Sequence, residues 1–379
     1  MDFTLSETQE VFKSTANKFF KEKCTITALK EAEKSAKNYS PALYKEIADL
    51  GFVGLIIPEE YGGAGGTFMD LAIVVEEAGY ANLPTPFLST IAYGAIPLLQ
   101  SGTEEQKQKL LPRIAEGEFI FTGAFSEPQS HYDYRLIKST LSDKGSTYSL
   151  NGKKLFVPFA ESADYLLTLA KSSNGDVRLL LVKGGQPDIL ITSIPAIGPE
   201  RVYEVNYRDV PLTSEDVLGN GGDGWSQTNR VIQMATALEC IEMVGVLRRA
   251  VEVTNEYVKE RRQFNRPIGS YQSVQHRLSD MLTVVEGGRL AAYQAMWRLA
   301  EGLPADRELA IAKAWLSKEG QNVLTGAHQL HGGMGIDIDY PLQFCFRRFK
   351  RFQLSMGTAP IHLKKIASSL ERKAVATKV

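Results

Sequence analysis

Cysteine is scarce in this sequence. Only three are present, Cys24, Cys240 and Cys345, and they lie far apart along the chain. An odd number at such wide spacing fits neither a disulfide framework nor a zinc site, which requires clustered ligands. We therefore expect no metal centre, and a reducing cytoplasm as the setting.

Long apolar runs and an excess of charge of either sign are also missing. No apolar run reaches the roughly 20 residues that a membrane-spanning helix needs. The segment Met1–Glu7 shows no basic stretch followed by an apolar core, so we expect no secretory signal. The chain has 43 basic and 44 acidic side chains, a net charge of −1. This balance argues against nucleic acid or an anionic membrane as the main partner.

The chain has 379 residues, 44% of them hydrophobic, which is enough for more than one small domain. Residues 1–118 have the apolar spacing of helices. Ser6 followed by Gln9 is a capping-box pattern that predicts a helix start. Further helices are expected over residues 67–79 and 103–116.

Residues 119–225 change to the alternating, β-rich pattern of strands. Asn151–Gly152 lies between two such runs and predicts a hairpin turn. No long helical stretches separate the runs, so an antiparallel sheet or small barrel is expected.

Helical spacing returns after Gly224, with long helices expected over residues 228–263, 273–302 and 306–328. Their apolar surface exceeds what one bundle can bury, which predicts a tetramer. The pattern predicts an α+β protein with three domains: an N-terminal helical domain (1–118), a central antiparallel β domain (119–225) and a C-terminal helical bundle (226–379).

Several motifs follow one another in this chain. They are Leu50–Gly63, Glu260–Gly269, Tyr271–His276, Gln329–Ile336 and Ser355–Ile361. In this order they resemble the acyl-CoA dehydrogenase family over nearly the whole length. The resemblance implies an N-terminal helical domain, a central antiparallel β domain and a C-terminal four-helix bundle.

The resemblance also implies an activity and its partners. Members of that family use FAD to oxidise the α,β bond of an acyl-CoA thioester and pass electrons to electron-transfer flavoprotein. We therefore expect FAD, an acyl-CoA ligand and a homotetramer or a heterotetramer with a related subunit.

The residue that serves as catalytic base in the resembled family is absent. The position before the final Gly-Thr, usually Glu, is Met356, and the alternative position on the first long C-terminal helix is Ala235. A thioether and a methyl group cannot take a proton. Glu239 lies one helical turn after Ala235 and is a weak candidate for a shifted base. The alternative is that Glu239 and Glu242 are structural acids.

The motifs that bind the adenine and pyrophosphate end of a neighbouring subunit's flavin are retained. Arginine suits a pyrophosphate because its planar fork makes paired hydrogen bonds, and adjacent glycines allow close backbone approach. The alternative is a solvated helix face followed by a helix cap. The residues that match these positions are Arg261, Gln263, Phe264, Gln272, Gln329, Gly332 and Gly333.

The flavin-ring half is altered. The candidate ring contacts are Phe125, Ser126, Phe156 and Thr358. The loop that follows Ser126 lacks the family's glycines and carries Gln129, His131 and Tyr132 instead. Proline replaces a polar contact at Pro158 and at Pro360, and proline has no N–H to donate.

Three functions remain open at this point. The leading hypothesis is a subunit of a hetero-oligomeric acyl-CoA dehydrogenase that lends pyrophosphate contacts and lacks the base. The second is a self-sufficient flavoenzyme with other chemistry, such as desulfination of an acyl-CoA. The third is a flavin-free scaffold that binds acyl-CoA.

Overall fold

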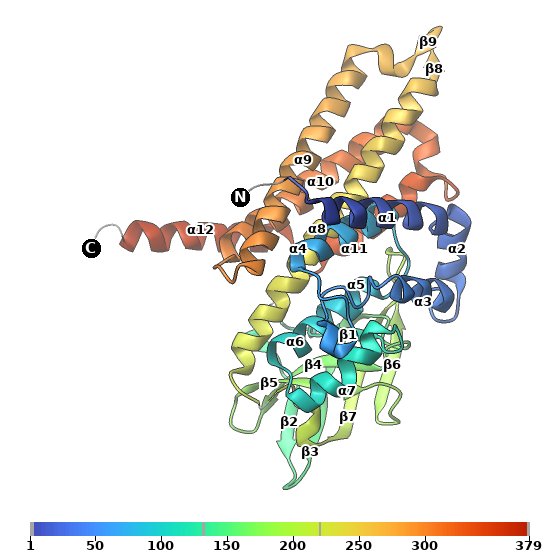
Figure 1. The fold of residues 1–379 in the computed structure, drawn as a ribbon. Coiled ribbons are helices and arrows are strands. Elements are labelled where there is room, and N and C mark those ends of the chain that lie inside the picture. The colour runs from blue at the N-terminus through green and yellow to red at the C-terminus, as the bar shows by residue number, and fades with distance from the viewer. Residues whose placement is uncertain (1–3, 131–132, 220, 377–379) are drawn as a thin grey trace.

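The computed structural model describes residues 4–130, 133–219 and 221–376. Helices from the N-terminal part, a central β-sheet and helices from the C-terminal part follow one another along the chain (Figure 1). The sheet lies at one end of the molecule, and the long C-terminal helices reach to the other end (Figure 1). The expected order of helical, β and helical domains is confirmed.

The N-terminal part is helical and its main helices begin at side-chain caps. Ser6 and Gln9 form the predicted capping box, and Thr67 and Thr103 cap later helices in the same way. The helices are α1 (Glu7–Lys23), α2 (Ile26–Lys34), α3 (Pro41–Asp49), α4 (Phe68–Tyr80), α5 (Phe87–Thr90), α6 (Ile96–Ser101) and α7 (Glu104–Ala115).

The central sheet has seven strands, in the order β1-β4-β2-β3-β7-β6, with β5 paired to β4. Most neighbours are antiparallel, as expected, but β1 and β2 each pair with β4 in parallel. The strands are β1 (Phe121–Ala124), β2 (Thr140–Asp143), β3 (Tyr148–Pro158), β4 (Tyr165–Ser172), β5 (Val177–Lys183), β6 (Ile189–Ile194) and β7 (Val202–Leu212).

Strands β4 and β5 are buried on both faces. Leu167 and Leu179 pack into the core that the helices share, whereas Leu166 and Leu180 pack into a second core within the sheet. This double burial explains why these strands appear in the sequence as continuous apolar runs.

The hairpin turn predicted at Asn151–Gly152 is wrong. Both residues lie inside the single strand β3, at a register shift against β7. The Asn151 side chain accepts from the Asp209 backbone N–H over 2.9 Å and donates to the Asp209 carboxylate over 2.8 Å. A Cβ on Gly152 would lie 2.1 Å from the Ser139 hydroxyl oxygen. The pair forms a bulge where Ser139, the residue before β2, approaches closely, rather than a turn.

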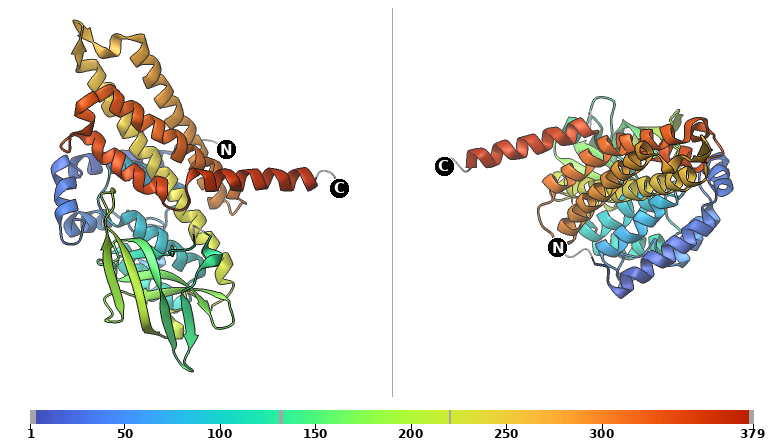
Figure 2. Two further views of the ribbon diagram at one scale, coloured as in Figure 1. Left: turned by 180° about the vertical axis from the view of Figure 1, so that it is seen from behind. Right: turned by 90° about the horizontal axis from the view of Figure 1, so that it is seen from above.

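The C-terminal part consists of long helices. The first extends from Gly224 to Glu260, rather than over the predicted residues 228–263. Helix α12 extends away from the body (Figure 2). The elements are α8 (Gly224–Glu260), β8 (Arg262–Gln263), β9 (Arg266–Pro267), α9 (Gln272–Ala300), α10 (Asp306–His331), α11 (Pro341–Leu354) and α12 (Ala359–Ala376).

Helices α4 and α8 cross at backbone contact. A Cβ on Gly79 would lie 2.2 Å from the Glu242 carbonyl oxygen, and one on Gly245 would lie 2.0 Å from the Glu76 carbonyl oxygen. Neither glycine could therefore be replaced without moving the two helices apart. This crossing joins the N-terminal helices to the C-terminal bundle.

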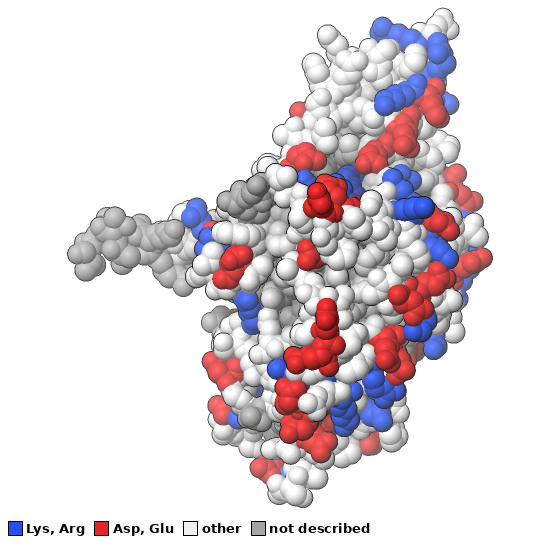
Figure 3. Space-filling view, viewed as in Figure 1, with Lys and Arg blue, Asp and Glu red and all other residues white. Residues whose placement is uncertain are grey.

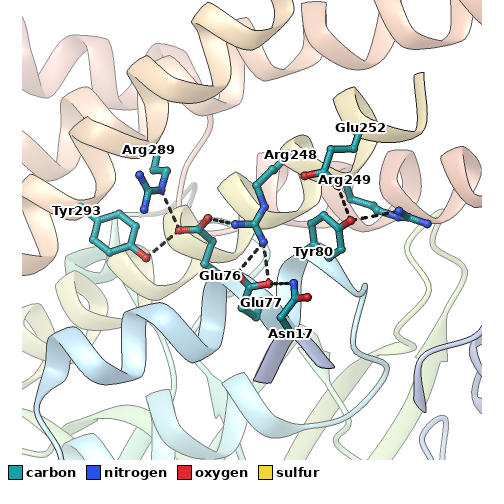
Figure 4. Close-up of polar contacts among 9 residues, drawn as sticks. All are labelled: Asn17, Glu76, Glu77, Tyr80, Arg248, Arg249, Glu252, Arg289 and Tyr293. Carbon is teal, nitrogen blue, oxygen red and sulfur yellow. Dashed lines mark hydrogen bonds and ion pairs between the residues drawn. The ribbon is translucent and has the colours of Figure 1, made fainter. Parts of the chain in front are cut away.

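Buried charges surround the same crossing (Figure 4). Arg248 on α8 donates to the adjacent carboxylates of Glu76 and Glu77 over 2.7 and 2.8 Å. Arg289 and Tyr293, both on α9, donate to Glu76 over 3.2 and 2.8 Å. Both carboxylates are nearly inaccessible to solvent. The network therefore links α4, α8 and α9.

Among the described residues, none of the helices has both the length and the apolar character that crossing a membrane requires.

Replacing Arg248 with methionine should destabilise the fold strongly. The change would leave Glu77 without its cation in a buried position, and breaking a buried ion pair from one side costs about 3–5 kcal/mol. The free energy of unfolding can be measured by urea denaturation followed by circular dichroism.

The matched control is Arg113→Met, because Arg113 pairs with Glu118 on the surface, where both side chains are about half exposed. That change should cost less than about 1 kcal/mol. Equal losses in the two variants would contradict the role assigned to the buried network.

Candidate functional site

Residue 356, where the resembled family places its base, lies in the turn between α11 and α12. Met356 and Gly357 have positive φ angles of 50° and 97°. The Nε2–H of His362 donates to the Met356 carbonyl oxygen over 3.0 Å. A Cβ on Gly357 would approach the same nitrogen to 3.1 Å. The turn that presents residue 356 is thus closely held.

His362, close to residue 356 in the structure, is poorly suited to act as a base. Burial lowers the pKa of His362 to about 4, so its imidazole is neutral near pH 7. A base with so low a pKa accepts a proton poorly. Its Nδ1 is buried and has no hydrogen-bond partner among the described residues. His362 therefore acts as a positioning residue for the turn.

The side chain of Met356 contacts an aromatic residue from the central part of the chain. Its sulfur lies 3.8 Å from the hydroxyl oxygen of Tyr134. Tyr134 in turn packs edge-on against Phe125, with ring centroids 6.1 Å apart. Phe125 packs against Tyr93 at 5.6 Å. An aromatic row therefore reaches the position where proton abstraction would occur.

The alternative base position is equally inert. Ala235 is buried on α8, and the hydroxyl of the neighbouring Thr236 donates to the Ile232 carbonyl oxygen over 2.6 Å. That hydroxyl is engaged within its own helix. Neither residue can remove a proton from a ligand.

Glu239, the weak candidate for a shifted base, is already paired. Its Oε2 accepts from the Ser355 hydroxyl over 2.6 Å and from the Lys313 ammonium over 3.3 Å. Lys313 is fully buried and also donates to the Phe352 carbonyl oxygen. These contacts fix the residue directly before Met356. They favour the structural alternative for Glu239.

Glu242 is also paired. The Arg348 guanidinium on α11 binds Glu242, and the same group donates to Glu200 over 2.8 Å. All three side chains are buried. This cluster joins α8 and α11 to the loop before β7, which again is a structural role.

The candidate flavin-ring contacts are close to one another in the central part. The Leu155 N–H donates to the Ser126 carbonyl oxygen over 2.9 Å, which places Ser126 beside the segment that carries Phe156. Phe156 is 58% exposed and has a φ of 58°. Pro158 is buried, and its carbonyl oxygen accepts from the Thr122 hydroxyl over 2.6 Å. Pro158 thus offers neither an N–H nor a free carbonyl to a ring edge.

The altered loop after Ser126 is held by buried contacts of Glu127 with β3 and with the residue before β2. Glu127 accepts from the fully buried Lys154 over 2.7 Å and from the Ser139 hydroxyl over 2.6 Å. Burial lowers the pKa of Lys154 to about 8. Gln129 is exposed, and the predicted bulky pair at residues 131–132 (His131 and Tyr132) lies outside the described residues.

Thr358 directly precedes α12 and is half-buried. Its carbonyl oxygen accepts from the backbone of Ile361 over 3.0 Å. Pro360 is exposed beside it. The role of Thr358 as a ring contact stays a prediction.

Strands β8 and β9 lie at the end of the molecule opposite the sheet (Figure 1). We call this hairpin, with the end of α10 that packs against α8 beside it, the tip. Figure 3 shows basic side chains gathered at this tip. All of the predicted pyrophosphate residues here are exposed, namely Arg261, Gln263, Phe264, Gln272, Gln329, Gly332 and Gly333.

Tyr257 links the two segments of this tip. Its carbonyl oxygen accepts from the Arg261 N–H over 2.8 Å, at the end of α8. Its ring stacks on His331, the residue before Gly332, at a centroid distance of 4.3 Å. Tyr271, directly before Gln272, donates its hydroxyl to the Gln263 carbonyl oxygen over 3.2 Å. The structure therefore brings these motif segments together.

The tip has features that its own fold does not require. Phe264 is 87% exposed and has a φ of 52°, and Asn265 has a φ of 66°, so the two form the turn between β8 and β9. A Cβ on Gly333 would meet nothing within 4 Å, and this glycine has no positive φ. Within the described residues, Arg261 has no side-chain partner. Exposed, strained and unpartnered groups of this kind are expected where a ligand or another chain approaches.

Backbone strain is concentrated at the predicted sites. Among the described residues, four that are neither glycine, asparagine nor aspartate have positive φ: Phe156, Phe159, Phe264 and Met356. Three of the four are predicted site residues. Positive φ costs free energy in such residues, and it is retained mainly where function requires it.

Several important side chains were not predicted from the sequence. Tyr134 contacts Met356 across 222 positions of sequence, and Lys313 pairs with Glu239 across 74. Tyr134 follows the loop that departs from the family pattern after Ser126, and that departure could have drawn attention to it. Nothing in the local sequence marks Lys313.

Within the described part of the chain, no group of three or more His, Cys, Asp or Glu side chains is arranged to hold an ion.

Comparison with known proteins agrees with the family resemblance that the motifs indicate. The acyl-CoA dehydrogenase N-terminal, middle and C-terminal domain models match residues 6–118, 122–210 and 222–371. Among curated relatives, subunit CarC of the caffeyl-CoA reductase–Etf complex of Acetobacterium woodii is 28% identical over 383 residues, covering 97% of this chain and 99% of the relative.

Solved structures agree with these matches. Butyryl-CoA dehydrogenase from Megasphaera elsdenii superposes with a TM-score of 0.91 at 28% identity, covering 98% of this chain and 100% of that one. The ChsE4–ChsE5 complex from Mycobacterium tuberculosis gives a TM-score of 0.91 at 27% identity, covering 98% and 99%. The chain belongs to the acyl-CoA dehydrogenase family.

Proposed function

We propose that this chain is a subunit of a hetero-oligomeric, FAD-dependent acyl-CoA dehydrogenase. It lends pyrophosphate contacts to a flavin and does not itself remove the α-proton. One asymmetry carries the proposal. The position of the base holds Met356 against Tyr134, whereas Arg261 and Gly333 lie exposed and unused at the tip.

Helix α8 separates the two half-sites. Ala235 marks the inner site and Arg261 follows the end of α8 at the tip. The rise of 1.5 Å per residue places them ~39 Å apart along the helix. Because the two half-sites of one chain lie so far apart, we infer that the tip of this chain would serve a ligand held by another subunit.

At the tip, each residue would have a distinct task. The Arg261 guanidinium would bind a phosphate through paired hydrogen bonds. Gly332 and Gly333 would allow the backbone to approach the dinucleotide, because neither position has a Cβ. Phe264 would cover an apolar surface. Bound FAD would supply the hydride acceptor for the assembled enzyme.

A related acyl-CoA dehydrogenase subunit would supply the base. The likeness to the ChsE4–ChsE5 complex supports an assembly of two such chains. We infer a tetramer, an acyl-CoA thioester as ligand and electron-transfer flavoprotein as electron acceptor. The domain boundaries near residues 118 and 225 and the cytoplasmic setting stay predictions.

The two other hypotheses receive less support. A self-sufficient flavoenzyme needs ring-edge contacts in the same chain, and Pro158 offers none. A flavin-free scaffold would give no role to the exposed Arg261 and Gly333. Bound flavin in the pure chain, without oxidation of saturated acyl-CoAs, would favour the flavoenzyme.

Replacing Arg261 with alanine should lower the flavin content of the complex with its partner subunit and leave the fold intact. The lost charge-assisted hydrogen bonds contribute about 1.5–3 kcal/mol to binding. Arg261→Lys should rescue binding only in part, because an ammonium lacks the planar fork. Flavin content can be measured by absorbance after light scattering has verified a tetramer.

Arg266→Ala is the matched control, since it removes one positive charge from the same hairpin at a residue that is not among the predicted pyrophosphate contacts. It should leave flavin occupancy nearly unchanged. Full occupancy in the Arg261→Ala complex would refute the proposed half-site, and a monomer would contradict the assembly.

Restoring the carboxylate through Met356→Glu should not make the isolated chain a dehydrogenase. The base would return, but Pro158 would still lack a donor for the flavin. Hydride transfer needs the reacting atoms ~3–3.5 Å apart, so a displaced ring is as disabling as a missing base. Turnover of butyryl-CoA by this variant, with an artificial electron acceptor, would show that the flavin-ring site is intact.

A further inference from the structure

A groove of about 1000 Å³ runs along the first turns of α8 and is bordered by α12 and the connection between α9 and α10. Trp225, Ile232 and Ile361 line it with half-buried apolar surface. Tyr134 also lines it and is the most buried of these four. We call the part of the lining formed by Tyr134 the inner end of the groove, because Tyr134 is buried and contacts Met356.

The groove also carries exposed cations. Arg307, Lys364 and Lys365 line it, and none has a hydrogen bond or close ion pair to another described residue. Its acids are partly engaged, because Asp306 accepts from a glutamine over 2.7 Å and Glu308 lies 3.4 Å from an arginine. Such a lining suits a ligand with phosphate groups at one end.

Tyr134 both lines this groove and contacts residue 356. Its hydroxyl oxygen lies 3.8 Å from the Met356 sulfur. Its ring is held by Phe125, which packs on Tyr93. Because three aromatic rings support one another, the Tyr134 ring cannot turn aside without breaking these contacts.

We propose that Tyr134 is a specificity-determining residue that prevents the acyl chain of a CoA thioester from reaching residue 356 in this chain. The groove would bind the phosphate-bearing part of the ligand and would make no contact with the acyl chain. This inference rests on the proposed function, since acyl-CoA is the ligand class that the proposal names.

The ring, rather than the hydroxyl, carries the effect. A phenol ring fills the volume that several methylene groups would need, and a thioether and a hydroxyl make only a weak contact. Removing the ring should open the inner end, whereas removing the hydroxyl alone should not. This difference defines the test.

The test titrates the full chain with CoA, acetyl-CoA, butyryl-CoA and hexanoyl-CoA by isothermal calorimetry. The unaltered chain should bind all four with affinities within about twofold, because no acyl carbon is buried. Tyr134→Val should bind butyryl-CoA more tightly than acetyl-CoA, by roughly fourfold for each added methylene. Tyr134→Phe, which keeps the ring, should behave like the unaltered chain.

Three results would overturn the inference. They are chain-length-dependent binding by the unaltered chain, no chain-length dependence in a folded Tyr134→Val variant, and no binding of any CoA ester by either protein. Circular dichroism establishes that the variant is folded.

Failure here can be separated from failure of the proposed function. The half-site is tested by flavin occupancy in the Arg261→Ala complex, and this readout does not depend on Tyr134. Loss of the Tyr134 effect with a normal Arg261 effect would reject the groove alone.

Discussion

The crossing of α4 over α8 is the constraint on which the rest of the structure depends. Gly79 and Gly245 allow backbone contact there, and Arg248 and Arg289 pair with the two buried carboxylates of Glu76 and Glu77 beside it. Removing either arginine would leave a buried carboxylate without its cation, which is costly. The crossing and its ion pairs link helix α8 to α4 in the N-terminal part and to α9 in the C-terminal part. The same helix then carries Glu239, which fixes the turn at residue 356.

This rigid helix gives the chain two chemically different ends. At the inner end, the turn that presents residue 356 is held by a hydrogen bond from the His362 imidazole to the Met356 carbonyl oxygen. Its side chain is nevertheless a thioether in contact with a tyrosine. At the outer end, Arg261, Phe264 and Gly333 are exposed, and Phe264 has a positive φ. We propose that a scaffold with these two ends works as a subunit for a neighbour.

Local signals in the sequence predicted the fold well, and the failures share a physical cause. The capping box at Ser6 depends on neighbouring residues only, so it could be predicted. Asn151–Gly152 was predicted as a turn because its local preference is strong, but contacts with Asp209 make it a bulge. The replacement of the resembled family's usual Glu by Met356 was visible from its motif position. The contact between Tyr134 and Met356 was not, because it joins segments that only the tertiary structure brings together.

The absorbance spectrum of the purified chain tests the central claim most directly. It should be recorded for the chain alone with added FAD, and again after co-expression with a related acyl-CoA dehydrogenase subunit from the same genome. Excess FAD is removed by gel filtration in both cases. The account predicts a colourless protein in the first case and a yellow complex in the second. A yellow homo-oligomer that oxidises acyl-CoA without a partner would contradict it.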